Sequence, residues 1–192
     1  MSNRYFIMRH GQSEANVAGI IISAPDSGVA EYGLSEEGSR QVRLSASLVD
    51  GDVFSRVICS DFKRAQQTAQ LVHEILEIVS PLETSSALRE RFFGSLEGGS
   101  DSRYPDVWRY DVDDERHSNF GVESVGEVVN RTTQLIQLLE QRFNNESILL
   151  VSHGDTLQIL QTLFEGVSPS SHRSLPPLAV AEIRRLGSWP QV

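Results

Sequence analysis

The sequence is short of cysteine, of long apolar runs and of positive charge. Cys59 is its single cysteine, which excludes an internal disulfide and fits a reducing cytosol. Apolar runs such as ILLV at 148–151 fall far below membrane-spanning length, and the apolar part of the N-terminal MSNRYFIMRHG is too short for a secretory signal. We therefore expect a soluble, cytoplasmic protein with no membrane partner.

The charge balance limits the partners further. A formal net charge of -9 argues against nonspecific binding to nucleic acid, although a local arginine cluster could still hold an anionic small molecule. A composition of 39% hydrophobic and 22% charged residues is that of an ordinary folded protein. The length of 192 residues predicts one domain over 1–192, with an insertion or lid at about 98–122.

Short apolar runs alternate along the chain with segments of helical periodicity. We expect strands at 5–8, 56–60, 147–152 and 178–186, and helices at 35–50, 61–76, 124–143 and 155–164. Ser124 and Glu127 form the S-x-x-E signature of a capping box, and Ser60 or Asp61 could cap the second helix. The segments 17–33 and 98–122 lack periodicity and are interpreted as irregular. This alternation predicts an α/β fold with a mostly parallel central sheet.

Three of these strands end in residues that suit an anion. They are Arg9, His10 and Gly11 after the first strand, Arg64 after the second, and His153 and Gly154 after the third. Ligands of parallel α/β sheets bind outside the carboxyl ends of the strands, so these side chains could converge. Each motif alone is weak, since arginine and histidine often share an exposed turn. Their conjunction at three strand ends is much less expected by chance.

Such a set suits phosphoryl transfer. Arginine forks and histidine N–H groups hold the charge of a transferred phosphoryl group in charge-assisted hydrogen bonds. An imidazole can itself act as the covalent nucleophile. The reaction also needs a proton donor for the leaving oxygen, which a carboxylic acid with a raised pKa could supply.

Four blocks in order carry a family resemblance. They are MRHGQSEAN at 8–16, SDFKRAQQTA at 60–69, LRERFFGSLEG at 88–98 and VSHGDTLQIL at 151–160. With these blocks the chain resembles the phosphoglycerate-mutase-like branch of the histidine phosphatase superfamily, over most of its length. The resemblance implies a three-layer α/β/α sandwich and an enzyme that needs neither metal nor cofactor.

The resemblance also implies roles for individual residues. It makes His10 the nucleophile that becomes phosphohistidine, and Glu90 the acid that protonates the leaving group and then activates water. The residues that it implies around the phosphate are Arg9, Asn16, Arg64, His153 and Gly154. Asn16 could instead simply cap a turn.

Glu90 also has a simpler interpretation. It lies between Arg89 and Arg91, so it could be a surface glutamate in an ion pair, and nearby arginines would lower its pKa. Glu14 and Glu97 are competing carboxylates in the matching blocks. The block favours Glu90 as the acid.

The remaining candidates have structural interpretations. Asp155 is expected to cap the helix that it begins, Cys59 to be buried packing and His73 to lie on the surface. His117 and His172 fall outside the matching blocks. The lid aromatics could stack on a substrate, but packing against the body is favoured; they are Tyr104, Trp108, Tyr110 and Phe120. The acidic run 111–115 is interpreted as a solvated face.

Three functions stay open at this point: a phosphatase, a phosphoglycerate mutase and a noncatalytic binding domain on the same fold. The mutases of the family carry a longer, lysine-containing middle insertion that binds a carboxylate. The segment 98–122 has no lysine and is rich in aspartate. We therefore expect a phosphatase acting on phosphomonoesters of small metabolites.

Overall fold

The computed structural model describes residues 3–49 and 54–189, and it contains a five-stranded sheet. The strands are β1 (Arg4–Arg9), β2 (Arg56–Cys59), β3 (Glu83–Thr84), β4 (Ser147–Ser152) and β5 (Ile183–Arg185). Their order is β3-β2-β4-β1-β5, and all neighbours are parallel except β5, which runs antiparallel to β1. The predicted α/β fold with a mostly parallel sheet is therefore confirmed. β3 was not predicted, and β5 is shorter than the expected strand at 178–186.

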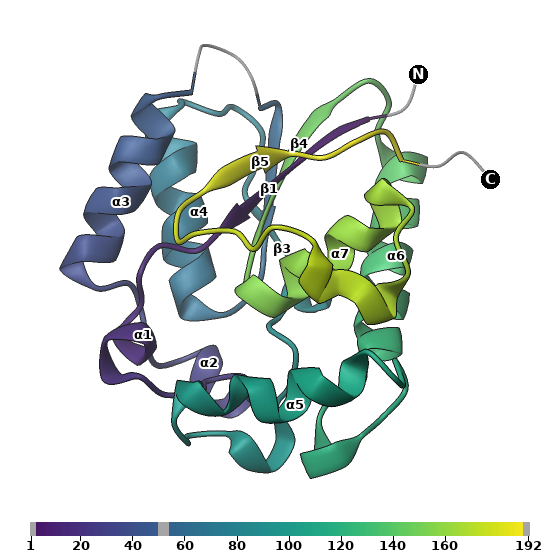
Figure 1. The fold of residues 1–192 in the computed structure, drawn as a ribbon. Helices are drawn as coiled ribbons and strands as arrows, with labels where there is room; N and C mark the ends of the chain where they lie inside the picture. The colour runs from purple at the N-terminus through teal and green to yellow at the C-terminus, as the bar shows by residue number, and fades with distance from the viewer. Residues whose placement is uncertain (1–2, 50–53, 190–192) are drawn as a thin grey trace.

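Helices cover both faces of the sheet (Figure 1). On one face lie α3 (Glu36–Ser47) and α4 (Lys63–Ile75), and on the other lie α6 (Val125–Arg142) and α7 (Gly154–Glu165). The strands divide their side chains between the faces by alternation: Ile7 packs in the core of α6 and α7, and Met8 packs in the core of α3 and α4. The three-layer α/β/α sandwich is therefore confirmed.

The central strand β4 sets the position of the sheet edge where the polar motifs lie. All six of its residues are buried, as its apolar run predicted. Arg9 at the end of β1 pairs with Ser152, and Cys59 at the end of β2 pairs with Val151. Because these strands are parallel and in step, the residues that follow them emerge at one edge of the sheet.

The helix starts agree with the sequence in two cases and differ in a third. Ser124 and Glu127 make the predicted capping box of α6, and Ser35 caps α3 through Gly38 N. The expected end of α3 at residue 50 lies outside the described residues. The predicted side-chain cap of α4 is wrong, because the N-cap is Phe62 and its side chain cannot accept a hydrogen bond.

Short elements fill the segments that were expected to be irregular. They are α1 (Glu14–Ala18), α2 (Pro25–Gly28), α5 (Tyr104–Asp111) and the 3₁₀ turns η3 (Asp101–Arg103) and η4 (Asn119–Gly121). Figure 1 shows α1, α2 and α5 grouped at the end of the molecule away from both termini. Ile21, Phe93, Val107 and Val122 form a small separate core there. The segment 98–122 is thus a packed layer over the polar edge of the sheet.

The other 3₁₀ turns connect the larger elements. They are η1 (Ser86–Leu88), η2 (Gly94–Leu96) and η5 (Pro169–Ser174). Among the helices of residues 3–49 and 54–189, none combines the length and the apolar character that crossing a bilayer requires.

Candidate active site

His10 lies directly after β1 and is 3% exposed. Its Nδ1 is 2.7 Å from Gly11 O, and because a carbonyl only accepts, the proton must be on Nδ1. Its Nε2 accepts a hydrogen bond of 3.2 Å from Arg64 Nε, so Nε2 carries the lone pair. Burial, and then the charges of Arg64 and Arg9, hold the pKa of His10 well below its ordinary value. The imidazole is therefore neutral, with its nucleophilic nitrogen facing a guanidinium.

The backbone around His10 is held from two sides. The N–H of Ala181 donates to both Arg9 O and His10 O, at 3.1 and 3.2 Å, with Ala181 itself at a φ of 58°. On the other side, a Cβ at Gly38 would lie 1.9 Å from Gln12 O, so the start of α3 rests directly on the loop after His10. These contacts leave His10 little freedom to move.

Two arginines beside His10 have unused donors. Arg64 gives Nη2 to Ile22 O at 2.9 Å, and Arg9 gives Nη1 to Leu178 O at 3.0 Å. Arg64 Nη1 and Arg9 Nε are buried without a hydrogen-bond partner among the described residues. Burial lowers the pKa of Arg64 to about 10, which still leaves it charged at neutral pH.

His153, which follows β4, adds a third unpaired group. Its ring is 5.1 Å from that of His10, and its Nε2 is 3.0 Å from Ser60 Oγ. Ser60 Oγ already accepts from Phe62 N, which favours donation of its own proton to His153 Nε2. Burial and the charge of Arg64 hold the pKa of His153 well below its ordinary value, so the ring is neutral with its proton on the unpartnered Nδ1.

The arrangement as a whole suits an oxyanion. A buried donor without a partner costs about 1–3 kcal/mol, and an anion placed among Arg9 Nε, Arg64 Nη1 and His153 Nδ1 would satisfy all three. A cavity of about 280 Å³ is lined by four of the predicted residues, Arg9, Asn16, Glu90 and Gly154, whereas His10, Arg64 and His153 are not among its lining residues.

Two of these lining residues owe their place to the local backbone. Asn16 Oδ1 accepts from Ser13 N at 3.0 Å in a capping box at the start of α1, so Asn16 caps a turn and also faces the cavity. Gly154 lies beside Arg9, and a Cβ there would be 3.4 Å from the guanidinium carbon, which is an ordinary van der Waals contact.

Glu90 is partly buried at the wall of the cavity. Its Oε1 accepts from Thr156 N at 3.1 Å, from Thr156 Oγ1 at 3.2 Å and from Arg91 N at 3.0 Å. No hydrogen bond within the described chain reaches Oε2, which leaves that oxygen to carry a proton. Burial, and then the carboxylate of Asp155, raise the pKa of Glu90, while Arg64 opposes the shift. The neighbouring arginines do not lower this pKa as their positions in the sequence suggested.

The raised pKa of Glu90 predicts a gain in stability on its removal. The folded protein binds this proton more tightly than the unfolded chain, so stability falls as pH rises from the ordinary glutamate pKa of about 4.3 through the folded value. We expect Glu90→Gln, whose amide oxygen can accept the same three hydrogen bonds, to unfold at a higher temperature than the wild type at pH 8. The difference should close near pH 4 in thermal unfolding followed by circular dichroism.

Glu74→Gln, on an exposed side chain of α4, is the matched control and should follow the wild type at every pH. The expectation is wrong if Glu90→Gln and the wild type keep the same difference in melting temperature from pH 4 to pH 8.

Arg89 and Arg91 turn away from Glu90. Arg89 holds Asp61 in a two-pronged ion pair, with Nη2 at 2.6 Å and Nε at 2.9 Å. Arg91 is fully buried and binds Asp111 through both Nη atoms at 2.8 Å. The solvated interpretation of the acidic run 111–115 is therefore wrong at its first residue, because Asp111 is 0% exposed and neutralised in the interior.

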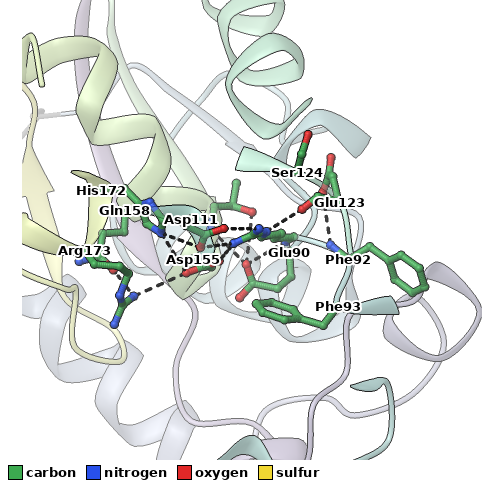
Figure 2. Close-up of polar contacts among 12 residues, drawn as sticks. Glu90, Phe92, Phe93, Asp111, Glu123, Ser124, Asp155, Gln158, His172 and Arg173 are labelled. Atoms are coloured by element: carbon green, nitrogen blue, oxygen red, sulfur yellow. Dashed lines mark hydrogen bonds and ion pairs between the residues drawn. The ribbon is translucent and has the colours of Figure 1, made fainter. Parts of the chain in front are cut away.

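Asp155 is also placed differently from its prediction. The N-cap of α7 is His153, and Asp155 lies inside the helix without capping it. Its Oδ2 accepts from Arg91 Nη1 at 3.2 Å, and the residue lines the cavity. The sequence therefore missed a buried cluster around Arg91; its members are Arg91, Asp111, His117, Asp155 and His172. Figure 2 shows Asp111, Asp155 and His172 of this cluster beside Glu90.

The competing carboxylates lie elsewhere. Glu14 is exposed and accepts from Gly33 N, and Glu97 accepts from the backbone and hydroxyl of Ser23. Neither lines the cavity. Cys59 is buried in the core of α3 and α4 as predicted, and burial raises the pKa of its thiol to about 12.

The lid aromatics mainly pack. Tyr104 and Trp108 stack at 5.4 Å with an interplanar angle of 8°, and both line the cavity. The guanidinium of Arg173 lies 3.7 Å from the centre of the Trp108 ring. Tyr104 also meets Phe93 edge-on. Tyr104 and Trp108 therefore pack against neighbours as favoured, and each also presents part of its surface to the cavity. Within the described ranges, no group of three or more histidine, cysteine, aspartate or glutamate side chains could hold a metal ion.

Comparison with known proteins agrees with this architecture. Residues 5–191 match the family model of the histidine phosphatase superfamily, branch 1. The adenosylcobalamin/alpha-ribazole phosphatase of Salmonella typhimurium is 30% identical over 82% of this chain and 77% of its own. The 2,3-bisphosphoglycerate-dependent phosphoglycerate mutase of Afipia carboxidovorans is 30% identical over 89% of this chain and 86% of its own. Among solved structures, the alpha-ribazole phosphatase from Shigella flexneri superposes with a TM-score of 0.76, at 28% identity over 95% of this chain and 89% of its own.

The fold and the match together define an enzyme of the α/β class that handles phosphate. The chain belongs to the histidine phosphatase superfamily, branch 1, and it is a histidine phosphatase enzyme. The family resemblance is thus confirmed, and the noncatalytic alternative is set aside. Relatives of both kinds, phosphatases and mutases, match at similar identity, so these comparisons leave the choice of reaction to the site.

Proposed function

We propose that this enzyme hydrolyses phosphomonoesters of small metabolites through a phosphohistidine on His10. The observation that carries the proposal is a neutral His10 whose Nε2 accepts from Arg64 Nε, together with three buried donors, Arg9 Nε, Arg64 Nη1 and His153 Nδ1, that have no partner in the described chain. A phosphate group among those donors lies against the nucleophile. Its charge is then held by the same groups through the loose transition state of phosphoryl transfer.

In the first half-reaction, Arg64 exchanges its hydrogen bond to His10 for one to a phosphoryl oxygen, which frees the Nε2 lone pair. Nε2 attacks phosphorus and forms the P–N bond while the bond from phosphorus to the leaving oxygen breaks. The proton of Glu90 passes to that oxygen, and the alcohol departs.

In the second half-reaction, the Glu90 carboxylate takes a proton from water as the water oxygen attacks phosphorus. The P–N bond breaks, inorganic phosphate leaves, and both His10 and protonated Glu90 are restored. Glu90 thus acts once as an acid and once as a base.

The charges of the cavity favour this hydrolysis over mutase chemistry on phosphoglycerate. Beyond the phosphate-binding Arg9, the cation at the cavity wall is Arg173, which already contacts Gln158, Asp155 and the face of Trp108. The carboxylate of a phosphoglycerate would find that guanidinium occupied and the Asp155 carboxylate beside it. A neutral leaving group meets no such repulsion.

The test is an assay of the purified enzyme on phosphorylated sugars, phosphoglycerates and p-nitrophenyl phosphate. Release of inorganic phosphate with transient label on His10 is expected. Interconversion of 2- and 3-phosphoglycerate without release of phosphate would replace the proposal with the mutase.

A further inference from the structure

The buried guanidinium of Arg91 binds two carboxylates, those of Asp111 and Asp155. Arg91 gives both Nη atoms to Asp111 at 2.8 Å, gives Nη1 also to Asp155 at 3.2 Å, and gives Nε to Glu123 O. The side chains of Arg91 and Asp111 are 0% exposed and that of Asp155 is 3% exposed. The better geometry belongs to Asp111, so the charge of Asp155 is only partly compensated by Arg91.

The other groups near Asp155 do not complete its neutralisation. Asp155 Oδ1 is buried and has no hydrogen-bond partner in the described chain. Arg173 Nη1 lies 3.5 Å away on a side chain that is 31% exposed, so its charge is partly screened by water. His172 Nε2 lies 3.9 Å away, while its Nδ1 gives its proton to Pro169 O. The negative charge of Asp155 is therefore compensated only in part by the groups around it, whose contacts Figure 2 shows.

Glu90 is the group that this charge faces. Its Oε1 is bound by Thr156, the residue next to Asp155 at the start of α7, and both carboxyl groups line one cavity. From α4 it faces Arg64, and from α5 it faces Tyr104, whose hydroxyl stays neutral because burial raises its pKa. A bound phosphate would take Arg64 as a partner, and its negative charge would act with that of Asp155 to favour the protonated form of Glu90.

We propose that Asp155 is a positioning residue whose buried, half-compensated charge keeps the proton on Glu90 until the leaving oxygen takes it. The inference rests on the proposed role of Glu90 as the acid. The same charge raises the pKa of Glu90 beyond what burial alone does. It also makes the Glu90 carboxylate a stronger base for the water of the second step. Arg91 and Asp111 fix where this charge lies.

The test compares Asp155→Asn with the wild type on substrates that differ in leaving group. An alkyl phosphate needs the acid, whereas p-nitrophenyl phosphate departs as a stable phenolate and needs it little. We expect kcat/KM at pH 7 to fall about tenfold or more for the alkyl phosphate and less than about threefold for p-nitrophenyl phosphate. The alkaline limb of the alkyl phosphate profile should move to lower pH, and the Glu90 carboxyl should titrate at lower pH in ¹³C NMR.

Three further variants sharpen the result. Asp101→Asn removes another carboxylate of the same cavity wall and should leave the limb in place. Asp155→Glu keeps the negative charge, so the alkaline limb of its alkyl phosphate profile should lie at the wild-type pH. Arg173→Gln, on a partly exposed side chain, removes a cation from Asp155 and should move the limb to higher pH, so the proposal is still tested if Asp155→Asn does not fold.

The outcomes separate this inference from the assignment of the acid. If Glu90→Gln loses far more activity on the alkyl phosphate than on p-nitrophenyl phosphate, while folded Asp155→Asn and Arg173→Gln keep the wild-type limb, Asp155 is only structural and the inference is overturned. If Glu90→Gln itself leaves the limb and the leaving-group dependence unchanged, the acid assignment fails and takes the inference with it.

Discussion

Replacing His10 with alanine should abolish phosphoryl transfer. In the proposed mechanism the lone pair of His10 Nε2, which accepts from Arg64 Nε in the structure, attacks phosphorus, so its loss removes the covalent route itself. We expect kcat/KM to fall by about 10⁴-fold or more, and no phosphoenzyme to be trapped by acid-free quench and mass spectrometry.

His73→Ala is the matched control. His73 lies on α4 with its Nε2 at 2.7 Å from Ser80 O, away from the cavity, and its removal should change kcat/KM less than about threefold. A phosphoenzyme that still forms in His10→Ala at the wild-type rate would assign the nucleophile to another residue.

The largest effect on stability should come from Arg91. Arg91→Met leaves Asp111 and Asp155 in the interior without their shared guanidinium, and removing one partner of a buried ion pair costs about 3–5 kcal/mol. For a chain of this length that corresponds to a melting temperature lower by about 6–20 °C. Thermal unfolding at pH 7 measures it. Adding Asp111→Asn to Arg91→Met should recover part of the loss, because it removes one of the stranded charges.

Arg142→Met is the control for charge removal as such. Arg142 pairs with Glu83 at 2.9 Å, but the two side chains are 44% and 30% exposed, so the cost should stay below about 1 kcal/mol. Equal losses in the two variants would show that the Arg91 pairs contribute no more than a surface ion pair.

The sequence predicted best those features that depend on residues close together in the chain. The run ILLV required a buried central strand, and parallel pairing with that strand then brought His10, Arg64 and His153 to one edge. The capping box at Ser124 likewise depends on residues only three apart. Such features are set within a few residues of the chain, so pattern alone predicts them.

The buried charge cluster could not be predicted in the same way. Asp111 and Arg91 are 20 residues apart, and nothing in the acidic run 111–115 distinguishes the one buried carboxylate from its solvated neighbours. Asp155 was predicted to cap α7 because the sequence alone does not show where this helix begins. In the structure the N-cap is His153, whose backbone is extended with a φ of -122°. β3 is two residues long, too short to leave a pattern.

The pairing of β1 has a consequence for the order in which the molecule folds. Its sheet neighbours are β4 and β5, and Arg4 pairs with Ser147 while Met8 pairs with Ile183. The N–H that holds Arg9 O and His10 O comes from Ala181. Closing loops of this length delays contact formation, so β1 and the His10 that follows it are fixed only once β4 and β5 have joined the sheet. Completion of the site is then a late event in folding, because it depends on segments far from β1 in the sequence.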